Sequence, residues 1–286
     1  MPFDGTFDIA RAPTAPPRNA PDKKDANDRL ERAVERIAEL QPILWAHDRH
    51  AVLLIFQALD AAGKDGTIRA VLQGVNPAGC DVHGFKAPSN EELDHDFLWR
   101  TTVRLPERGR IGVFNRSYYE EVLVVRAHPE LLAAQNLPDQ IEARDIWQER
   151  FESIRDHERH LARNGTVILK FFLHVSLDEQ RERFLSRLDE PHKNWKFNER
   201  DVHERDFRDA YMTAYEEALR ATSRPWAPWY AIPADSKSYM RMTVAELVAA
   251  GLERLDLRYP EVTPEERARF DSMRALLAPE PAARRG

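Results

Sequence analysis

The sequence predicts an α/β fold built on a mainly parallel sheet, and two observations support this prediction. Short apolar runs typical of buried strands alternate with longer segments of helical periodicity along most of the chain. Strands joined by helical crossovers form a parallel sheet covered on both faces, and such sheets bind ligands at the carboxyl ends of their strands. The second observation is a glycine-containing loop with a lysine, residues 58–67, placed between an apolar run and a helical segment.

The predicted elements begin with an arm and a helix. Residues 1–26 are rich in proline, alanine and charged side chains, which predicts an extended arm that wraps either a neighbouring subunit or the body of the protein. From residue 27 onwards, apolar positions three and four apart predict an amphipathic helix that leads into the first strand. We expect strands at residues 51–56, 80–85, 110–114, 166–173 and 229–232.

A long, charged segment separates the last two predicted strands. Between residues 177 and 222 the pattern is helical and is interrupted at Pro191. Two interpretations remain open: a helical hairpin that leans over the ligand site as a lid, and an ordinary pair of surface helices. The predicted organisation is therefore the arm, one domain over residues 27–262 that contains this segment, and a C-terminal tail over residues 263–286.

Length and composition indicate a globular protein with one large core. The chain has 286 residues, of which 42% are hydrophobic and 31% charged. Its apolar runs are shorter than the roughly 18 residues of a membrane span, and its first residues lack the pattern of a signal peptide. We therefore expect a cytoplasmic enzyme without a membrane partner. The single cysteine, Cys80, excludes an internal disulfide and is interpreted as a small buried residue.

The net charge and the motif content exclude several classes of function. The formal net charge is -6, whereas non-specific nucleic-acid binding depends on clustered lysine and arginine, so we expect no nucleic-acid partner. A phosphate-rich ligand would need basic side chains concentrated in a cleft. The histidines form no H-E-x-x-H zinc motif and no serine lies in a G-x-S-x-G turn, which disfavours zinc and serine hydrolases.

Residues 58–67 form an atypical phosphate-binding loop. The usual pattern is G-x-x-x-x-G-K-[ST], but here Ala58 replaces the first glycine and Asp65 replaces the hydroxyl residue that binds magnesium. Backbone N–H groups and the helix dipole attract phosphate at such a turn, and Lys64 adds a full charge. The alternative, a glycine and a lysine in an ordinary strand-to-helix turn, agrees less well with the strand and the second glycine. The predicted phosphate-binding residues are Ala61, Ala62, Gly63, Lys64, Asp65, Gly66 and Thr67.

A second polar cluster follows the third predicted strand. The strand ends in Asn115, where a metal-binding carboxylate is usual in phosphate-loop enzymes, so Asp60 in the loop is the candidate Mg²⁺ ligand. Arg116 can bind two phosphate oxygens at once and keeps its charge at all ordinary pH values. Phosphoryl transfer depends on positioning and on neutralising the charge of the transferred group. Lys64, Arg116 and Mg²⁺ fit that requirement.

Further lysines are candidate phosphate contacts. Lys86 follows the second predicted strand and is proposed from its position alone. Lys193 and Lys196 flank Trp195 in the charged segment. They are interpreted either as a clamp on a polyanion or as basic residues whose stems cover packed aromatic rings, and composition does not separate these two interpretations.

Several motifs in order along the chain resemble one family. They lie at residues 60–67, 75–77, 97–100, 105–106, 114–117, 195–197 and 227–230. Over roughly residues 30–255 the chain resembles the polyphosphate kinase 2 family. This resemblance implies a P-loop kinase-like three-layer α/β/α sandwich with a helical lid. It also implies inorganic polyphosphate as phosphoryl donor, Mg²⁺ as cofactor and nucleotides as acceptors.

The resemblance also implies roles for single residues. Asp60, Lys64 and Arg116 would form the catalytic centre, with Asp60 as the Mg²⁺ ligand. The nucleotide-binding residues would be Asn115, Arg116, Glu120 and Arg126, and the polyphosphate-binding residues would be Lys64, Lys86, Lys193 and Lys196. With asparagine at position 115, the sequence resembles the subgroup of the family that phosphorylates both AMP and ADP. The implied partners are polyphosphate, AMP, ADP and ATP, in a homo-oligomer of two or four subunits.

Two other functions remain as alternatives. An ATP-dependent nucleoside monophosphate kinase would favour a standard Gly-Lys-Ser/Thr loop, which Asp65 contradicts. A non-catalytic sensor of nucleotide or polyphosphate would bind without turnover. The combination of Asp60 and Arg116 disfavours such a sensor because a protein that only binds has no need of a group to stabilise a transition state.

Overall fold

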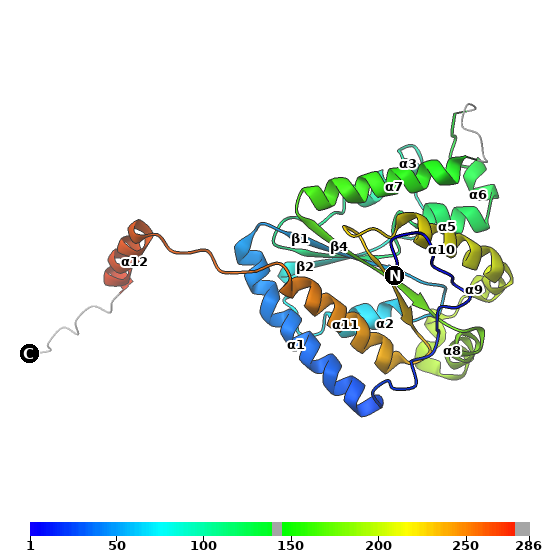
Figure 1. Ribbon diagram of the computed structural model, residues 1–286, viewed down its shortest axis with the longest axis horizontal. Helices are drawn as coiled ribbons and strands as arrows, with labels where there is room; N and C mark the ends of the chain where they lie inside the picture. The colour runs from blue at the N-terminus through cyan, green and yellow to red at the C-terminus, as the bar shows by residue number, and fades with distance from the viewer. Residues whose placement is uncertain (139–144, 278–286) are drawn as a thin grey trace, which may run out of the picture.

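A five-stranded parallel sheet forms the centre of the molecule. The computed structural model describes residues 1–138 and 145–277 (Figure 1). The strand order is β2-β3-β1-β4-β5, and all pairs are parallel. The strands are β1 (Ala51–Gln57), β2 (Cys80–Gly84), β3 (Ile111–Asn115), β4 (Thr166–His174) and β5 (Trp229–Pro233). The predicted α/β class and all five predicted strands are confirmed, and no strand end differs from its predicted position by more than one residue.

Helices cover both faces of the sheet and make a three-layer sandwich. The core on one face includes residues of α1 (Lys23–His47), α2 (Lys64–Val71) and α11 (Lys237–Glu253). The core on the other face includes residues of α5 (Glu120–Ala127), α7 (Ile146–Arg163) and α10 (Arg208–Thr222). All seven residues of β1 are buried, as expected for a central strand with apolar layers on both sides.

The register of the sheet brings two loops together. Phe56 at the end of β1 is level with Asn115 at the end of β3. The chain leaves β1 through α2 on one face and leaves β3 through α5 on the other face. Neighbouring strands whose connections leave on opposite faces open a crevice at their carboxyl ends. The loop after β1 and the turn after β3 therefore border the same space.

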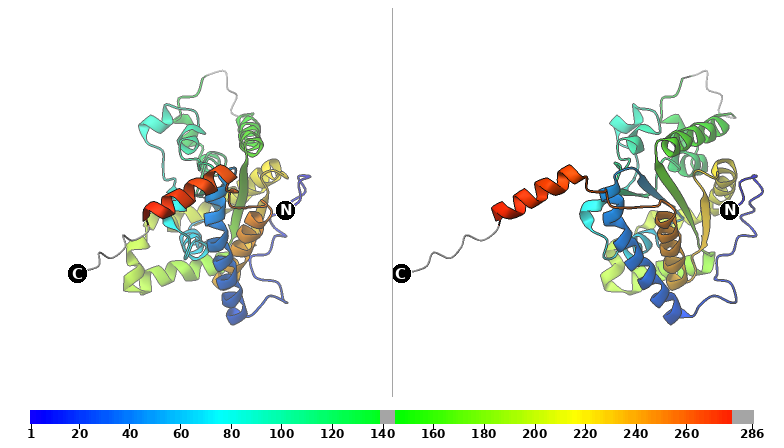
Figure 2. Two further views of the ribbon diagram at one scale, coloured as in Figure 1. Left: turned by 90° about the vertical axis from the view of Figure 1, so that its left-hand side faces the viewer. Right: turned by 60° about the vertical axis from the view of Figure 1, so that its left-hand side comes forward.

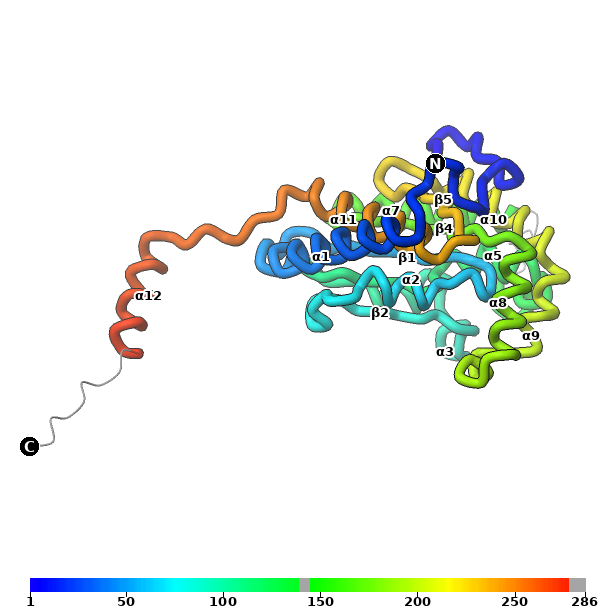
Figure 3. The backbone as a smooth tube through the Cα atoms, turned by 90° about the horizontal axis from the view of Figure 1, so that it is seen from below, coloured from blue at the N-terminus to red at the C-terminus, as the bar shows by residue number. Residues whose placement is uncertain are grey.

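The N-terminal arm wraps the body of the protein. Phe7 and Ile9 are buried, and the N–H of Ile9 donates to a carboxylate oxygen of Glu216 on α10 at 2.8 Å. The N–H of Asp235, just after β5, donates to the carbonyl of Thr14 at 2.9 Å. In Figure 3 the arm runs beside β5 and α10. It covers the edge of the sheet, where unpaired strand groups would otherwise be open to pairing.

Helix α1 begins earlier than predicted. It starts at Lys23 because the Asp22 side chain caps it, accepting hydrogen bonds from the N–H groups of Lys24 and Asp25. The arm is therefore extended only as far as Asp22. Cys80 was interpreted as a small buried residue, but it is only partly buried, at the start of the edge strand β2.

Only part of the segment 177–222 leans away from the body. It contains α8 (Leu177–Asp189), the 3-10 turns η2 (Pro191–Lys196) and η3 (Glu204–Phe207), the short helix α9 (Glu199–His203), and α10. The hairpin of α8 and α9 projects beside the sheet ends (Figure 3). Helix α10 instead packs in the core, with Tyr211, Ala214 and Leu219 buried. The predicted lid therefore ends at η3, because the apolar face of α10 belongs to a layer of the sandwich.

The remaining elements are short or peripheral. They are η1 (Pro77–Gly79), α3 (Asn90–Leu93), α4 (Trp99–Thr102), α6 (Glu130–Ala133) and α12 (Pro264–Leu277). Helix α12 has no buried residue and projects away from the body (Figure 2). Among the helices in the described ranges, each is too short or too polar to cross a bilayer.

Candidate active site

The phosphate loop joins β1 to α2 through two unusual backbone conformations. Gly63 has φ of 106° and caps α2, and Ala61 has φ of 60°. A Cβ at Gly63 would lie 3.1 Å from the Met240 side chain, so glycine meets both a conformational and a steric need. The first N–H groups of a helix have no partner inside the helix. Those of α2 consequently lie at the loop as donors for an anion.

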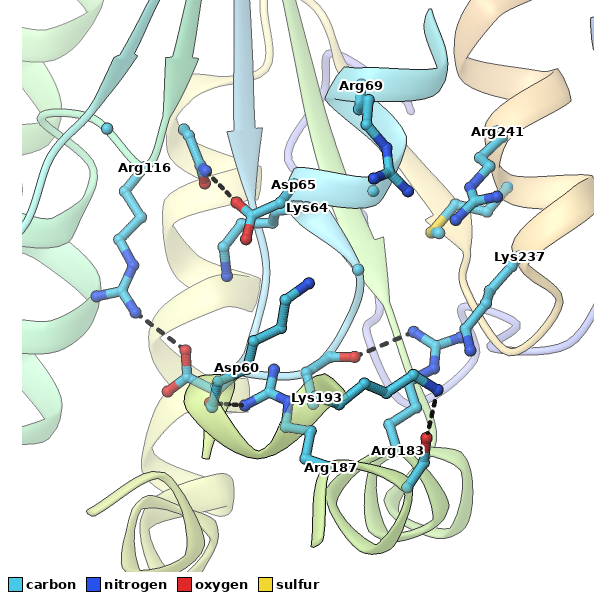
Figure 4. Close-up of a pocket in the computed structure, with 18 of the residues that line it drawn as sticks. Asp60, Lys64, Asp65, Arg69, Arg116, Arg183, Arg187, Lys193, Lys237 and Arg241 are labelled. Atoms are coloured by element: carbon cyan, nitrogen blue, oxygen red, sulfur yellow. Dashed lines mark hydrogen bonds and ion pairs between the residues drawn. The ribbon is translucent and has the colours of Figure 1, made fainter. Parts of the chain in front are cut away.

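A cavity of about 560 Å³ opens above this loop, and basic residues are the most numerous kind among those that line it. Its walls come from the loop, the ends of β2 and β3, helix α8, turn η2 and helix α11. Figure 4 shows side chains from these elements converging on one space. The basic residues that line it are Lys64, Arg69, Lys86, Arg116, Arg183, Arg187, Lys193, Lys196, Lys237 and Arg241. Two acids, Asp60 and Asp65, line it as well.

Lys64 lies across its own loop. Its Nζ donates to the carbonyls of Ala58 at 2.7 Å and Leu59 at 3.3 Å. Burial, and then the charge of Arg116, lowers the pKa of Lys64. These carbonyls hold the ammonium group close to the loop N–H groups, where a phosphate would bring the counter-charge that Lys64 lacks.

Arg116 is placed by its backbone as well as by its side chain. Its φ of 65° is a left-handed conformation that costs a non-glycine residue about 1–3 kcal/mol. Its N–H donates to the carbonyl of Phe56 at 3.0 Å, which ties the turn to β1. The guanidinium pairs with Asp60 at 3.0 Å and with Glu120 at 3.1 Å. The charges of these acids, that of Glu120 foremost, raise the pKa of Arg116.

Asp65 links the loop to the end of β3. Its carboxylate accepts a hydrogen bond from the Asn115 side-chain amide at 2.6 Å. The residue that replaces the usual hydroxyl therefore contacts the residue that replaces the usual strand-end acid.

A second cavity of about 350 Å³ lies next to the first. It is lined by Glu120, Leu123 and Val124 of α5, by Tyr211 and Tyr215 of α10, and by residues of the lid hairpin. Asp60, Ala87 and Arg116 line both cavities. Burial raises the pKa of Glu120. The Asp60–Arg116 ion pair consequently stands where the two cavities meet.

Helix α8 is fastened directly to the phosphate loop. The Arg183 guanidinium is buried and donates to the carbonyls of Ala61 at 3.2 Å, Ala62 at 2.5 Å and Ala234 at 2.6 Å. Gln180 donates to the carbonyl of Asp60 at 3.0 Å. The base of the lid hairpin is therefore part of the site, which favours the lid over an ordinary pair of surface helices.

The structure places most of the predicted residues in this site, with some differences in detail. Thr67 is buried and its hydroxyl donates to the carbonyl of Gly63 at 3.0 Å, so its side chain supports the loop from behind. Ala62 is also buried beneath the loop. Lys193 pairs with Glu190, and Lys196 lies over the Trp195 ring, 5.1 Å from its centroid. Trp195 is 78% exposed, which does not fit the packing interpretation of the lysine-flanked aromatic ring.

Arg126 is not brought into the site. It lines neither cavity, and its guanidinium pairs with Glu217 of α10 at 2.6 Å and stacks on Trp147. The helical turn between Glu120 and Arg126 points the arginine toward α10 and α7. Its contacts are those of a residue that holds three helices together.

Sequence reasoning missed five basic residues of the first cavity. They are Arg69, Arg183, Arg187, Lys237 and Arg241. The signal was present in part, because Arg183 and Arg187, and likewise Lys237 and Arg241, are four residues apart and so share one face of a helix. That spacing is also common on solvated helices, and only the packing of α8 and α11 shows which face meets the cavity.

The donor set fits a magnesium ion that also binds phosphate. Within residues 1–138 and 145–277, no three His, Cys, Asp or Glu side chains form a metal cluster. Mg²⁺ usually takes only one or two carboxylates and completes its coordination with water and substrate phosphates. Asp60 and Asp65 supply two carboxylates on the loop, facing the basic cavity.

Fold and site together define a phosphate-loop protein with a site for a polyanion beside a second ligand site. The model of the polyphosphate kinase 2 family matches residues 20–259 of the chain. The chain therefore belongs to the polyphosphate kinase 2 family and is an enzyme of the phosphotransferase type.

Relatives and a solved structure agree with this assignment. The chain is 54% identical over 271 residues, 94% of both chains, to a Rhodopseudomonas palustris protein named ADP-polyphosphate phosphotransferase. It is 44% identical over 259 residues to a Meiothermus ruber protein named AMP/ADP-polyphosphate phosphotransferase, covering 90% of this chain and 93% of that one. The crystal structure of polyphosphate kinase 2 from Arthrobacter aurescens TC1 matches with a TM-score of 0.84 at 37% identity, covering 93% of both chains.

Proposed function

We propose that this protein transfers a phosphoryl group from inorganic polyphosphate to AMP and ADP, giving ADP and ATP, and that the reaction is reversible. The observation that carries the proposal is the meeting of two cavities at Asp60 and Arg116. A basic cavity suits a polyanionic donor, and a second cavity with tyrosine rings and apolar side chains suits a nucleoside. The names of the relatives from Rhodopseudomonas palustris and Meiothermus ruber support the same reaction.

The proposed reaction needs positioning more than covalent help from the protein. A phosphate oxygen of the acceptor attacks the terminal phosphorus of the polyphosphate, and the bond from that phosphorus to the chain breaks. The shortened chain leaves with the electron pair of the broken bond. Because the attacking phosphate oxygen is already anionic, no general base has to remove a proton from it.

Charge on the transferred group is neutralised from both sides. Lys64 and the loop N–H groups hold the donor phosphates, and Arg116 reaches the transferred group from the turn after β3. The carboxylates of Asp60 and Glu120 hold the Arg116 guanidinium in place before substrates arrive. Phosphate oxygens then compete with these carboxylates for the same N–H donors.

The proposed cofactor is Mg²⁺, held by Asp60 with Asp65 nearby. When bound, the ion would screen the negative charge of the substrate phosphates. Asp60 also pairs with Arg116. Its carboxylate would therefore position both Mg²⁺ and the Arg116 guanidinium at the place where the phosphoryl group is transferred, which we call the transfer point.

The test compares donors and acceptors in parallel. The protein is mixed with Mg²⁺ and AMP, or with Mg²⁺ and ADP, and receives either polyphosphate or ATP as donor, and nucleotides are separated by chromatography. We expect ADP and then ATP from AMP with polyphosphate. Product from AMP only when ATP is the donor would favour the nucleoside monophosphate kinase, and tight binding without product would favour the sensor.

Assembly and location are separate proposals. We propose a homo-oligomer of two or four subunits, and the exposed apolar side chains Phe270, Met273 and Leu277 of α12 support it. Light scattering on the full chain and on a chain ending at residue 263 tests this, and a monomer at micromolar concentration for the full chain would contradict it. A cytoplasmic location is supported by the proposed nucleotide substrates.

A further inference from the structure

Three basic side chains at one end of the first cavity form no ion pair with any residue that the structure describes. Arg69 lies in the last turn of α2, and Lys237 and Arg241 lie in the first turns of α11 (Figure 4). Across the described ranges 1–138 and 145–277, none of these three side chains forms an ion pair. The Nε of Arg241 is buried and has no hydrogen-bond partner in the described structure. We call these residues the distal basic cluster.

Two arginines nearer the Asp60–Arg116 pair, Arg116 itself and Arg187, are neutralised by acids of the protein. Arg116 pairs with Asp60 at 3.0 Å, and Arg187 of α8 pairs with Asp201 of α9 at 3.1 Å. The distal basic cluster has no such ion pair within residues 1–138 and 145–277, and Arg183 adds like charge beside Lys237 and Arg241. Burial, followed by the charges of Arg69 and Arg183, lowers the pKa of Arg241. An anion bound there would relieve this repulsion.

The cluster continues the surface of the phosphate loop. A Cβ at Gly66 would lie 3.1 Å from Nη2 of Arg241, so the guanidinium rests directly on the loop. The N-terminal turn of α11, capped by Ser236, adds positive potential at the same place. Asp60 and Arg116, shared with the second cavity, lie at the other end of the view in Figure 4. The cavity therefore has a transfer end and a distal end.

We propose that the distal basic cluster binds internal phosphates of the polyphosphate chain and sets a preference for long chains. This inference rests on the proposed function. A donor whose terminal phosphate lies between Asp60 and Arg116 directs the rest of its chain along the loop. A long chain covers the cluster, whereas a short donor placed in the same way leaves it without an anion.

The test measures donor binding without turnover. Tripolyphosphate and long-chain polyphosphate are titrated separately into the full chain by calorimetry, without a nucleotide. For Arg241→Gln we expect Kd for the long chain to rise about tenfold, the loss of roughly one charge-assisted phosphate contact. Kd for tripolyphosphate should change less than about twofold. Arg69→Gln should likewise raise Kd for the long chain much more than Kd for tripolyphosphate.

The matched control is Arg254→Gln. Arg254 follows the last residue of the same helix, is exposed, and lines neither cavity. Arg254→Gln removes the same charge as Arg241→Gln, but it does so outside the cavity. We therefore expect both Kd values to stay unchanged. Circular dichroism and thermal unfolding establish that each variant is folded.

Two results would overturn the inference. One is an equal rise of Kd for both donors in the Arg241 and Arg69 variants, and the other is an unchanged Kd for the long chain. A failure of the proposed function is detected separately, as absence of nucleotide product with the unsubstituted protein. Chain-length-dependent binding in a protein without turnover would uphold the cluster and reject the transfer reaction.

Discussion

Arg116 illustrates how a single residue is placed before its ligands arrive. Its left-handed backbone, with φ of 65°, follows directly from β3 and is held by the hydrogen bond to Phe56. Its guanidinium is held by Asp60 and Glu120 through its two terminal nitrogens. Fixing the charge in the folded state means that little reorganisation is needed when negative charge develops on a transferred group. The strain at this backbone position is therefore located at the proposed transfer point.

The first prediction concerns Lys64. Lys64→Ala should lower kcat at least about 100-fold, because it removes a positive charge aimed at the donor phosphates. The midpoint of thermal unfolding should change by less than about 3 °C, since the lost bonds to two carbonyls are offset by relief of a partly buried charge. Nucleotide product and thermal unfolding are the measurements. Lys24→Ala, on the exposed face of α1, is the control, and near-normal rates in Lys64→Ala would contradict the assignment.

The second prediction concerns Asn115. Its amide donates to Asp65, and Asn115→Asp would set a carboxylate against that carboxylate. The added negative charge beside the acceptor phosphates should weaken use of ADP more than of AMP, because ADP carries more charge. We expect the ratio of kcat/KM for ADP to that for AMP to fall about fivefold, a change of about 1 kcal/mol. Asn115→Ala separates loss of the hydrogen bond from the added charge, and an unchanged ratio in the aspartate variant would contradict the prediction.

Residues of the loop and of the strand end could be predicted from the sequence because their roles follow from local order. The loop motif places Asp60 and Lys64 after a strand, and parallel strands bring Arg116 to the same edge. Arg126 could not be placed in this way. It is ten residues beyond Arg116 on a helix, and only the packing of α5 against α10 shows that it faces Glu217.

At the scale of elements, the lid hairpin is fixed at its base and open at its tip. Arg183 and Gln180, on the first half of α8, bond to the carbonyls of the phosphate loop. The tip at η2 has no buried residue. An element anchored at one end can move its far end while its base stays in register with the loop.

The third prediction tests this anchor. Arg183→Met should lower the free energy of unfolding by about 2–4 kcal/mol, because buried carbonyls of Ala61, Ala62 and Ala234 lose their donor. KM for polyphosphate should also rise, since the lid loses its attachment to the loop. Urea unfolding and donor kinetics are the measurements. Arg181→Met is the control on the same helix, since Arg181 is exposed and, among the described residues, forms an ion pair with its neighbour Glu182 alone. Equal stability of the two variants would refute the anchor.

The sequence predicted the elements better than their packing. Strand positions agree to within one residue, and β1, β3 and β4 stand out from their surroundings because they are largely apolar and buried. The start of α1 was placed four residues late because the cap at Asp22 was not recognised. Helix α10 was assigned to the lid because its charged positions are visible in the sequence, whereas the burial of Tyr211 and Tyr215 depends on the neighbouring sheet.

At the scale of the whole molecule, a buried ion pair joins the sheet to the helix layer behind the site. Lys170 of β4 and Glu158 of α7 are fully buried and pair at 2.6 Å. Lys170 also donates to the Tyr119 hydroxyl and to the Thr222 carbonyl, both at 2.9 Å. Tyr119 directly precedes α5, so this network connects the central sheet to the turn that carries Arg116. Burial lowers the pKa of Lys170 to about 8.

The fourth prediction is the pH dependence of this pair. Between pH 8 and about 10 the native Lys170 loses its proton while the unfolded one, with an ordinary pKa of 10.5, keeps it. The unfolded state then binds more protons, so this group makes the free energy of unfolding rise with pH, by up to about 1.4 kcal/mol per unit. Lys170→Met should remove that rise, and at pH 7 it should cost about 3–5 kcal/mol because Glu158 is left unpaired.

The pH dependence of the free energy of unfolding is measured by urea unfolding at a series of pH values from 7 to 10, on the natural protein and on the Lys170→Met variant. The double variant Lys170→Met with Glu158→Gln is the reference, because it removes both charges and should recover part of the stability lost at pH 7. Parallel dependence on pH in the natural protein and the double variant would contradict the lowered pKa of Lys170.

The sequence by itself determined the α/β class, the strands and the phosphate loop with Asp60, Lys64, Asn115 and Arg116. These follow from patterns that are read over a few neighbouring residues, because backbone preferences and strand burial act locally. Only the tertiary structure decided which faces of α8 and α11 meet the cavity, that α10 belongs to the core, and that the arm covers β5. Such contacts join residues far apart in the chain and depend on how whole elements pack, so the distal basic cluster, built from α2 and α11, exists only in the folded molecule.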